Sequence, residues 1–211
     1  MYQPLQFNKS ADLAIAEDIV RAHAFASLIS NDDDGVPYVT HLPLHLEKRE
    51  GTGHESGWIL LGHVAKPNHH WRFLQARPRA VATFLGPHSY LSPQVYPDLA
   101  RVPTWNYLAV HCTVEATLVE EPRAKDQLLK KLIGDHEPPY AEQWRGLGED
   151  FALKMLAGIT AFELRVTGLQ CKVKLNQHRP ESHAKMKAAY EAGNEDERAL
   201  AQWMARLGMG G

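Results

Sequence analysis

Apolar and polar residues alternate with a period of two over much of the first 120 positions, which is the pattern of half-buried β-strands. The alternation is cleanest at 110–118, where Val, Cys, Val, Ala and Leu are separated by His, Thr, Glu and Thr. Shorter or less regular segments of the same kind precede it. The pattern therefore predicts five successive strands, at 25–30, 36–47, 58–65, within 79–93 and at 110–118, and the fourth of them runs into a proline-bounded loop before residue 93.

The strand predicted at 36–47 has two different faces. Its even-numbered residues, from Val36 to Leu46, are mostly apolar, whereas His41, His45 and two prolines occupy the other face. Because proline cannot donate to a neighbouring strand, we predict that this strand lies at an edge or rim of the sheet.

Helical spacing appears between and after the strands. Ser10 is a candidate N-cap for a first helix with apolar residues from Leu13 to Val20, and KPNHHWRFLQ opens a short second one. A third helix is predicted to start at Pro122 and to end at Gly134. The segment 140–158 predicts a further helix, interrupted at its glycines, and the tail from Glu181 onward is charged, alanine-rich and helical.

The segment 159–177 alternates as well, but its phase changes in the middle. Even-numbered residues are apolar from Phe162 to Val166, and odd-numbered residues are apolar from Leu169 to Leu175. We predict two strands here, joined by a turn or bulge at Thr167–Gly168.

Five consecutive strands with few helices between them favour an antiparallel sheet, because a doubly wound parallel sheet would need alternating strands and helices. The fold class predicted is mostly β, an antiparallel barrel with helical attachments. A length of 211 residues suits one domain with a small appendage, or at most two small domains. We place the domain at 1–178 and the helical appendage at 179–211.

Composition and charge narrow the functional classes. With 23 Lys and Arg against 25 Asp and Glu, the net charge of −2 gives no global attraction to nucleic acid. Cys112 and Cys171 fall at apolar strand positions, so we interpret them as buried hydrophobic residues rather than a disulfide. The first residues lack the features of a signal peptide and no apolar run could span a membrane, so a cytoplasmic protein is expected.

The common catalytic and metal-binding motifs are not found. His41 and His45 are four residues apart on a strand, about 13 Å, too far to share a zinc ion. His69 and His70 are adjacent and point apart, and there is no HExxH, cysteine-pair or EF-hand pattern. GLGED is an isolated GxG, and neither a P-loop nor GxSxG is present. We predict no metal site and assign no catalytic residue.

Three stretches favour a planar, phosphorylated ligand. THLPL places a Thr and a His in the middle of a strand, and GHVAKPNHHW ends a strand with His63, Lys66 and Asn68 before a helix. A lysine and the N–H groups at a helix start can bind phosphate. PTWNY offers an indole, an amide and a phenol, which can stack on an aromatic ring and bond its edge. Taken singly, each stretch is more simply a turn, a helix cap or a core anchor.

These stretches also carry a resemblance to a known family. GVPYVTHLPL, GHVAKPNHHW, GPHSYLSP, VPTWNY and KLNQ occur in the same order as in the PaiB-like FMN-binding negative transcriptional regulators, and the likeness runs from MYQP to about Arg179. The resemblance implies a split β-barrel of the type found in pyridoxamine-phosphate oxidases and flavin reductases. It also implies a homodimer with FMN near the subunit interface, and a repressor that affects sporulation and protease genes.

The resemblance further implies twelve FMN contacts in four groups. They are Thr40, His41 and Leu42 at the flavin ring, His63, Lys66 and Asn68 at the ribityl chain and phosphate, Trp105, Asn106 and Tyr107 closing the pocket from the same or the other subunit, and Lys174, Asn176 and Gln177 at its flank. One position departs from the family, which usually has a Ser where this chain has Asn176. Asn can still donate and accept hydrogen bonds.

Three functions remain open from the sequence. The first is an FMN-binding regulator, with DNA as a partner by resemblance only, because the tail that could contact DNA carries the acidic run NEDE after its lysines. The second is a flavin-dependent oxidoreductase, in which His41, His63 or His111 would donate a proton. The third is a flavin-free structural or interaction protein that has kept the fold.

Overall fold

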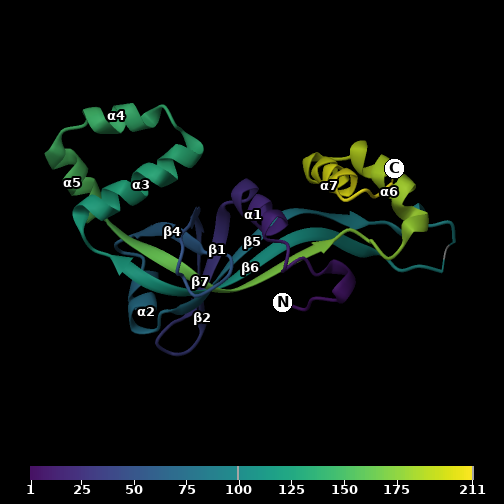
Figure 1. Ribbon diagram of the computed structural model, residues 1–211, viewed down its shortest axis with the longest axis horizontal. Helices are drawn as coiled ribbons and strands as arrows, with labels where there is room; N and C mark the ends of the chain where they lie inside the picture. The colour runs from purple at the N-terminus through teal and green to yellow at the C-terminus, as the bar shows by residue number, and fades with distance from the viewer. Residues whose placement is uncertain (99, 211) are drawn as a thin grey trace. The chain divides into compact units, whose positions relative to one another are not determined.

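The computed structural model describes residues 1–98 and 100–210 and contains an antiparallel sheet with helices before, between and after its strands (Figure 1). The strands are β1 Phe25–Asn31, β2 Pro37–Pro43, β3 His45–Lys48, β4 Trp58–Ala65, β5 Arg79–Leu91, β6 Thr104–Val119 and β7 Ile159–Lys174. The α-helices are α1 Leu13–Ala22, α2 His70–Ala76, α3 Pro122–His136, α4 Tyr140–Gly146, α5 Glu149–Ala157, α6 His183–Glu191 and α7 Glu195–Arg206. Short 3₁₀ turns lie at Leu5–Phe7, Pro93–Val95 and Pro180–Ser182. No helix in the described part of the chain is both long and apolar enough to cross a membrane.

The strand order explains why the sheet curls into a barrel. Hydrogen-bonded neighbours run β2-β1-β5-β6-β7-β4-β3, so β2 and β3 lie at opposite edges of the sheet. Only Leu44 separates these two strands in the sequence. Since Pro43 and His45 are two Cα steps apart, at most about 7 Å, the two edges must come together, and the sheet has to close on itself. The predicted antiparallel barrel with helical attachments is confirmed.

The chain forms two compact units, and each is described by itself. Unit 1 contains residues 1–22, 85–110 and 170–211, and unit 2 contains residues 23–84 and 111–169. The three long strands β5, β6 and β7 each contribute one part to each unit. These two units do not correspond to the domain boundary at residue 178 that the sequence predicts, and that boundary stays a prediction.

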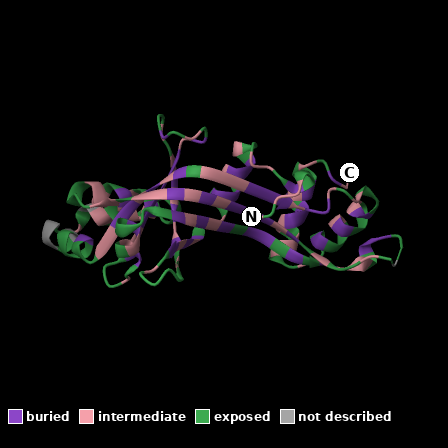
Figure 2. Ribbon diagram, turned by 90° about the horizontal axis from the view of Figure 1, so that it is seen from below, coloured by how far each residue is buried: buried purple, intermediate pink, exposed green. Residues whose placement is uncertain are grey.

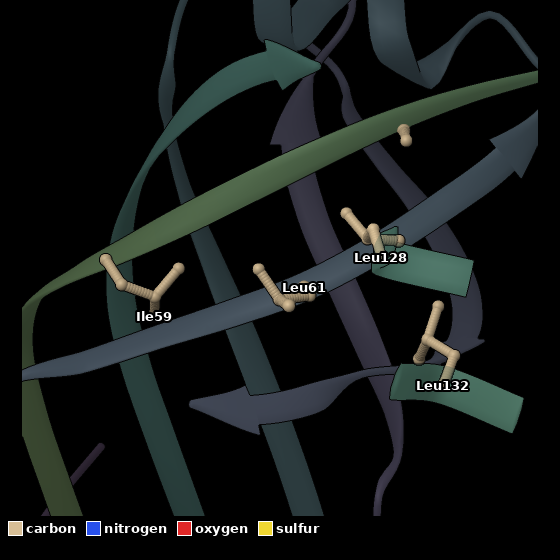
Figure 3. Packing of buried hydrophobic residues seen from close by; sticks show 5 residues of the cluster. Ile59, Leu61, Leu128 and Leu132 are labelled. Carbon is tan, nitrogen blue, oxygen red and sulfur yellow. The ribbon is translucent and has the colours of Figure 1, made fainter. Parts of the chain in front are cut away.

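The core of unit 2 is built around β4, which is buried on both faces. Its even-numbered residues, with Leu60 fully buried, face Leu42, Leu44 and Phe162. On its other face, Ile59 and Leu61 pack with Ala161 of β7 and with Leu128 and Leu132 of α3 (Figure 3). A strand covered on both sides has a continuous apolar sequence, which is why WILLGHVA lacks a strict alternation.

The core of unit 1 is formed by the even-numbered residues of β6, by α1 and by the tail helices. Leu108 and Val110 are fully buried, and so are Ile19 and Val20 of α1. Met186, Tyr190, Leu200 and Met204 supply the apolar faces of α6 and α7. Figure 2 shows how buried and exposed residues alternate along the long strands.

Several predicted elements need correction. Residues 159–174 form one strand, not two: the burial phase does invert near Gly168, but the chain stays extended there. Residues 36–47 form two strands broken at Leu44, and α3 continues through Gly134 to His136. The first helix begins at Leu13 and is capped by Asp12, whose Oδ1 accepts from the N–H of Ile15 at 3.1 Å, rather than by Ser10.

Other expectations are confirmed. The segment 140–158 forms two helices, α4 and α5, separated at its glycines, and the tail forms α6 and α7. Both cysteines are buried, and burial raises the pKa of the Cys171 thiol to about 12, as expected of a hydrophobic residue.

Gly62 is expected to be intolerant of any side chain. A Cβ at this position would lie 2.6 Å from Leu44 Cδ2 and 3.0 Å from Phe162 Cε2. Overpacking of this kind costs typically about 1–3 kcal/mol, so Gly62→Ala should lower the free energy of unfolding by about 2 kcal/mol in a urea titration. Gly134→Ala is the control: a Cβ there meets nothing within 4 Å, and alanine in a helix is favoured by roughly 0.5–1 kcal/mol. Equal stability of the two variants would contradict the packing argument.

Candidate functional site

A connected polar cluster lies in unit 2, between the middle of β2 and the start of α2. The Thr40 hydroxyl oxygen lies 3.2 Å from Asn68 Nδ2 and 2.8 Å from His70 Nδ1. Asn68 Oδ1 accepts from the backbone N–H of His70 at 2.9 Å and from the Tyr38 hydroxyl at 3.4 Å. Segments about 30 residues apart in the chain are thereby joined through Thr40, which is half-buried.

His70 is the most deeply buried member of this cluster. Its side chain is fully buried, and its ring lies edge-on to Tyr38 with the ring centroids 5.1 Å apart. Burial lowers the pKa of His70 to about 4, so the imidazole is neutral at pH 7. Among the described residues, Nε2 has no hydrogen-bond partner.

Lys66 stands between the end of β4 and this cluster. Its backbone is fixed at both ends, because its N–H donates to Gly158 O at 2.9 Å and its carbonyl accepts from Trp71 Nε1 at 3.0 Å. The side chain is exposed, and in the described part of the chain no acidic group forms an ion pair with its ammonium. Lys66 is thus a cation held on a fixed backbone.

His63, His41 and Leu42 are placed differently from one another. His63 is half-buried on β4, burial lowers its pKa, and its Nδ1 has no partner among the described residues. Leu42 is buried in the core. His41 lies on the opposite, exposed face of β2, where its Nδ1 is 3.0 Å from Ser27 Oγ and its ring stacks on Phe25. The structure therefore joins Thr40 to Asn68, but directs His41 away from them.

In unit 1, the stretch around Trp105 divides between two faces of β6. Trp105 is 52% exposed and lies beside His88 and Tyr90, with ring centroids 6.2 Å and 6.3 Å away. Asn106 points the other way and is fully buried, where its Nδ2 donates to the Tyr190 hydroxyl of α6 at 2.9 Å. Tyr107 returns to the first face. The amide of Asn106 thus attaches β6 to the tail, and its contact with FMN stays a prediction.

The end of β7 contributes the remaining residues of unit 1. Lys174 Nζ donates to Thr104 Oγ1 at 2.6 Å and lies 5.9 Å from the centre of the Tyr107 ring, and burial together with Lys172 lowers its pKa. Asn176 is buried at a φ of 61° and donates to Ser182 Oγ at 2.9 Å. Asparagine tolerates this left-handed conformation better than most residues. Gln177 closes a local turn with the backbone of Leu175 and Val173.

Two members of the polar cluster, Tyr38 and His70, were missed by sequence reasoning. Both stand within the quoted stretches, and Tyr38 shares the predicted face of Thr40, so a signal for it was present. His70 had none, because adjacent histidines before a helix do not show which one faces inward. In the described part of the chain, no group of three His, Cys, Asp or Glu side chains could hold a metal ion.

The groups present in unit 2 fit a phosphorylated flavin. The ligand needs a cation for its phosphate, and Lys66 provides an ammonium without an acidic partner among the described residues. It also needs hydroxyl and amide groups for its ribityl chain and ring edge, and Thr40 and Asn68 provide them beside a neutral histidine. The seven-residue helix α2 is too short to add an anion site of its own, and the His70 N–H is already taken by Asn68.

The fold is that of the split-barrel class, and this donor set suits a flavin. Residues 1–168 match the family described as "Putative FMN-binding domain". The chain belongs to this FMN-binding family, and FMN is its cofactor.

The chain also resembles single proteins, one of them in sequence and others in fold alone. The chain is 32% identical over 188 residues to "Protease synthase and sporulation protein PAI 2" of Bacillus subtilis, covering 86% of this chain and 84% of that protein. Among solved structures, its fold is similar to that of Rv2991 from Mycobacterium tuberculosis, with a TM-score of 0.58 at 14% identity over 82% of this chain and 90% of the other. It is also similar to the flavocytochrome Anf3 from Azotobacter vinelandii, with a TM-score of 0.57 at 18% identity over 77% and 67% of the two chains.

Proposed function

We propose that this FMN-binding protein acts as a homodimeric negative regulator of transcription. The observation that carries the proposal is its likeness, over most of both chains, to a Bacillus protein named for protease synthesis and sporulation. FMN would be held in unit 2 by Lys66 at the phosphate and by Thr40 and Asn68 near the ring and ribityl chain. In unit 1, Trp105 is exposed and Tyr107 and Lys174 are half-buried, and their contact with FMN stays a prediction.

The state of the histidines counts against an oxidoreductase that uses a histidine as its acid. Such an enzyme would need a ring that holds an extra proton near the flavin at neutral pH. Burial lowers the pKa of His63 and of His111 below the ordinary value of 6.5, and it lowers the pKa of His70 to about 4, so the neutral form of each ring predominates at pH 7. His41 lies on the exposed face of β2, away from Thr40.

The tail helices are a poor choice for reading DNA. α6 and α7 are joined by a three-residue turn, 192–194, which resembles the spacing of a helix-turn-helix. A recognition helix presents its N-terminal residues to the DNA, but the first turn of α7 is Glu195, Asp196 and Glu197. Glu197 moreover accepts from Ser89 Oγ at 2.8 Å and closes the capping box of Asn194. We therefore propose that the tail packs on unit 1 and that any DNA contact lies elsewhere.

The proposal is tested by selecting fragments of genomic DNA with the purified FMN-loaded protein, at several salt concentrations. A regulator should enrich a small set of fragments, with an affinity that falls steeply as salt rises. The same preparation is then mixed with reduced nicotinamide cofactor. Rapid flavin reduction with turnover, and no enriched fragment, would favour the oxidoreductase instead.

The dimer proposal rests on an exposed apolar surface of the β1–β2 hairpin. Phe25 is 70% exposed and Val39 is 47% exposed, and both lie beside His41 on the outer face. Exposed apolar clusters of this kind mark interaction surfaces, and a two-fold dimer would use the same surface in both copies.

Val39→Asp is expected to weaken dimerisation roughly hundredfold, because two symmetry-related charges would replace two valines that the proposed dimer buries. Light scattering over a dilution series measures the change. Thr117→Asp, also at an exposed strand position of unit 2, is the control and should stay dimeric. A wild-type protein that is monomeric at micromolar concentration would contradict the proposal.

A further inference from the structure

The hydrogen bonds around Thr40 determine which way each group points. The backbone N–H of His70 can only donate, so the Asn68 atom that receives it must be the carbonyl oxygen Oδ1. The other end of the same side chain is therefore the NH₂ group, and Thr40 Oγ1 must accept from it at 3.2 Å. One of the two lone pairs of the Thr40 hydroxyl is thus occupied.

The second neighbour of the Thr40 hydroxyl is Nδ1 of the neutral His70 ring, 2.8 Å away. Two arrangements are possible. If Nδ1 carries the ring proton, it donates to Thr40, and Nε2 has only a lone pair. If Nε2 carries the proton, Thr40 donates to Nδ1, and a buried N–H remains without a partner among the described residues. Orphaned N–H groups in protein interiors are rarer than orphaned acceptors, so the Nδ1-protonated ring is favoured.

We propose that His70 is a positioning residue that, together with Asn68, makes Thr40 an obligatory hydrogen-bond donor to the bound flavin. With both lone pairs of Oγ1 filled by Asn68 Nδ2 and His70 Nδ1, the hydroxyl proton of Thr40 has to point outward. That Thr40 meets FMN rests on the proposed function; the direction of its proton does not.

A fixed donor selects the part of the ligand that it meets. The oxidised flavin ring carries acceptors at its two carbonyl oxygens and at its imine nitrogens, and a single donor at its imide N–H. Thr40 would bond an acceptor and disfavour the imide N–H, because two donors facing each other leave both unpaired. The cluster is then a specificity element for how the ring is oriented, as well as a source of affinity.

The first test needs no flavin. In ¹⁵N-labelled protein at pH 7 without FMN, the His70 ring is expected to show its proton on Nδ1 and a bare nitrogen at Nε2, assigned with the His70→Asn variant. A proton on Nε2 would overturn the inference, because Thr40 would then donate to His70.

The second test uses FMN titrations of wild type and four variants. Thr40→Val, which keeps the shape but loses the hydroxyl, is expected to lose about tenfold in affinity, while Thr40→Ser stays close to wild type. Asn68→Asp keeps the side-chain oxygen that accepts from the His70 N–H, but it replaces the NH₂ group that donates to Thr40 by a second oxygen. The Thr40 hydroxyl then donates its proton to this oxygen instead of to the flavin. Affinity should fall here as well, and adding Thr40→Val to Asn68→Asp should cost nothing further.

The outcomes separate the inference from the proposed function. Two results with a wild-type protein that binds FMN would overturn the role of Thr40. One is that Thr40→Val leaves the FMN affinity unchanged, and the other is that Thr40→Val still lowers the affinity tenfold when Asn68→Asp is already present. A wild-type protein that binds no FMN would count against the proposed site, whereas the position of the His70 proton would still decide whether the cluster forces Thr40 to donate. Charge repulsion introduced by Asn68→Asp is common to both proteins that carry this substitution and cancels in their comparison.

Discussion

Replacing Lys66 by alanine is expected to weaken FMN binding roughly 10- to 100-fold, which corresponds to about 1.5–3 kcal/mol for a charge-assisted hydrogen bond. The physical reason is that the ammonium has no acidic partner among the described residues. It therefore does not have to give up an ion pair with those residues in order to bind the phosphate. Its backbone is held by Gly158 and Trp71, so the cation is positioned before the ligand arrives. Fluorescence titration of FMN measures the change.

Controls make this prediction specific for the phosphate. Lys185→Ala removes the same charge from an exposed position on α6 and should leave FMN affinity unchanged. Riboflavin, which lacks the phosphate, should bind wild type and Lys66→Ala equally. If Lys66→Ala keeps full FMN affinity, or loses riboflavin affinity to the same extent, Lys66 does not bind the phosphate.

Acidification is expected to destabilise the protein through His70. Its pKa is about 4 in the folded protein, against 6.5 for an ordinary histidine, so the unfolded chain binds the proton more tightly. The contribution of the neutral His70 ring to the free energy of unfolding is therefore complete above pH 6.5 and is lost as the pH falls toward 4. At 1.36 kcal/mol for each unit of pKa difference, the loss is about 3 kcal/mol over this window.

Urea unfolding at pH 7, 6, 5 and 4.5 tests this prediction. His63 and His111, whose pKa values burial also lowers, add to the slope in the same direction, so the contribution of His70 is the difference between wild type and His70→Asn. Hydrogen bonds from Arg49 lower the pKa of Glu47 to about 2. The stability that the ionised Glu47 contributes is lost only below about pH 4.5, so it does not affect this comparison. Parallel slopes for the two proteins would contradict a neutral, buried His70.

The split of the stretch VPTWNY between two faces could have been predicted more fully than it was. The alternation that identifies Leu108, Val110 and Cys112 as core residues extends back to Asn106, which places this amide on the buried face. Trp105 and Tyr107 fall on the other face by the same rule. The period of two was thus sufficient to predict where each residue points, whereas the chemistry of the three side chains and the family resemblance grouped them all as ligand contacts.

The sequence by itself determined most of the strands, the antiparallel class and the family, because alternation and family stretches are local properties that neighbouring residues carry together. Only the tertiary structure decided that 159–174 is one strand: neighbours on both sides supply its hydrogen bonds, β4 pairing antiparallel with its first half, and keep it extended through the phase change. The same holds for the site. Thr40 and His70 are 30 residues apart, and their contact exists because β2 and the start of α2 meet in the folded chain, where burial keeps the His70 ring neutral.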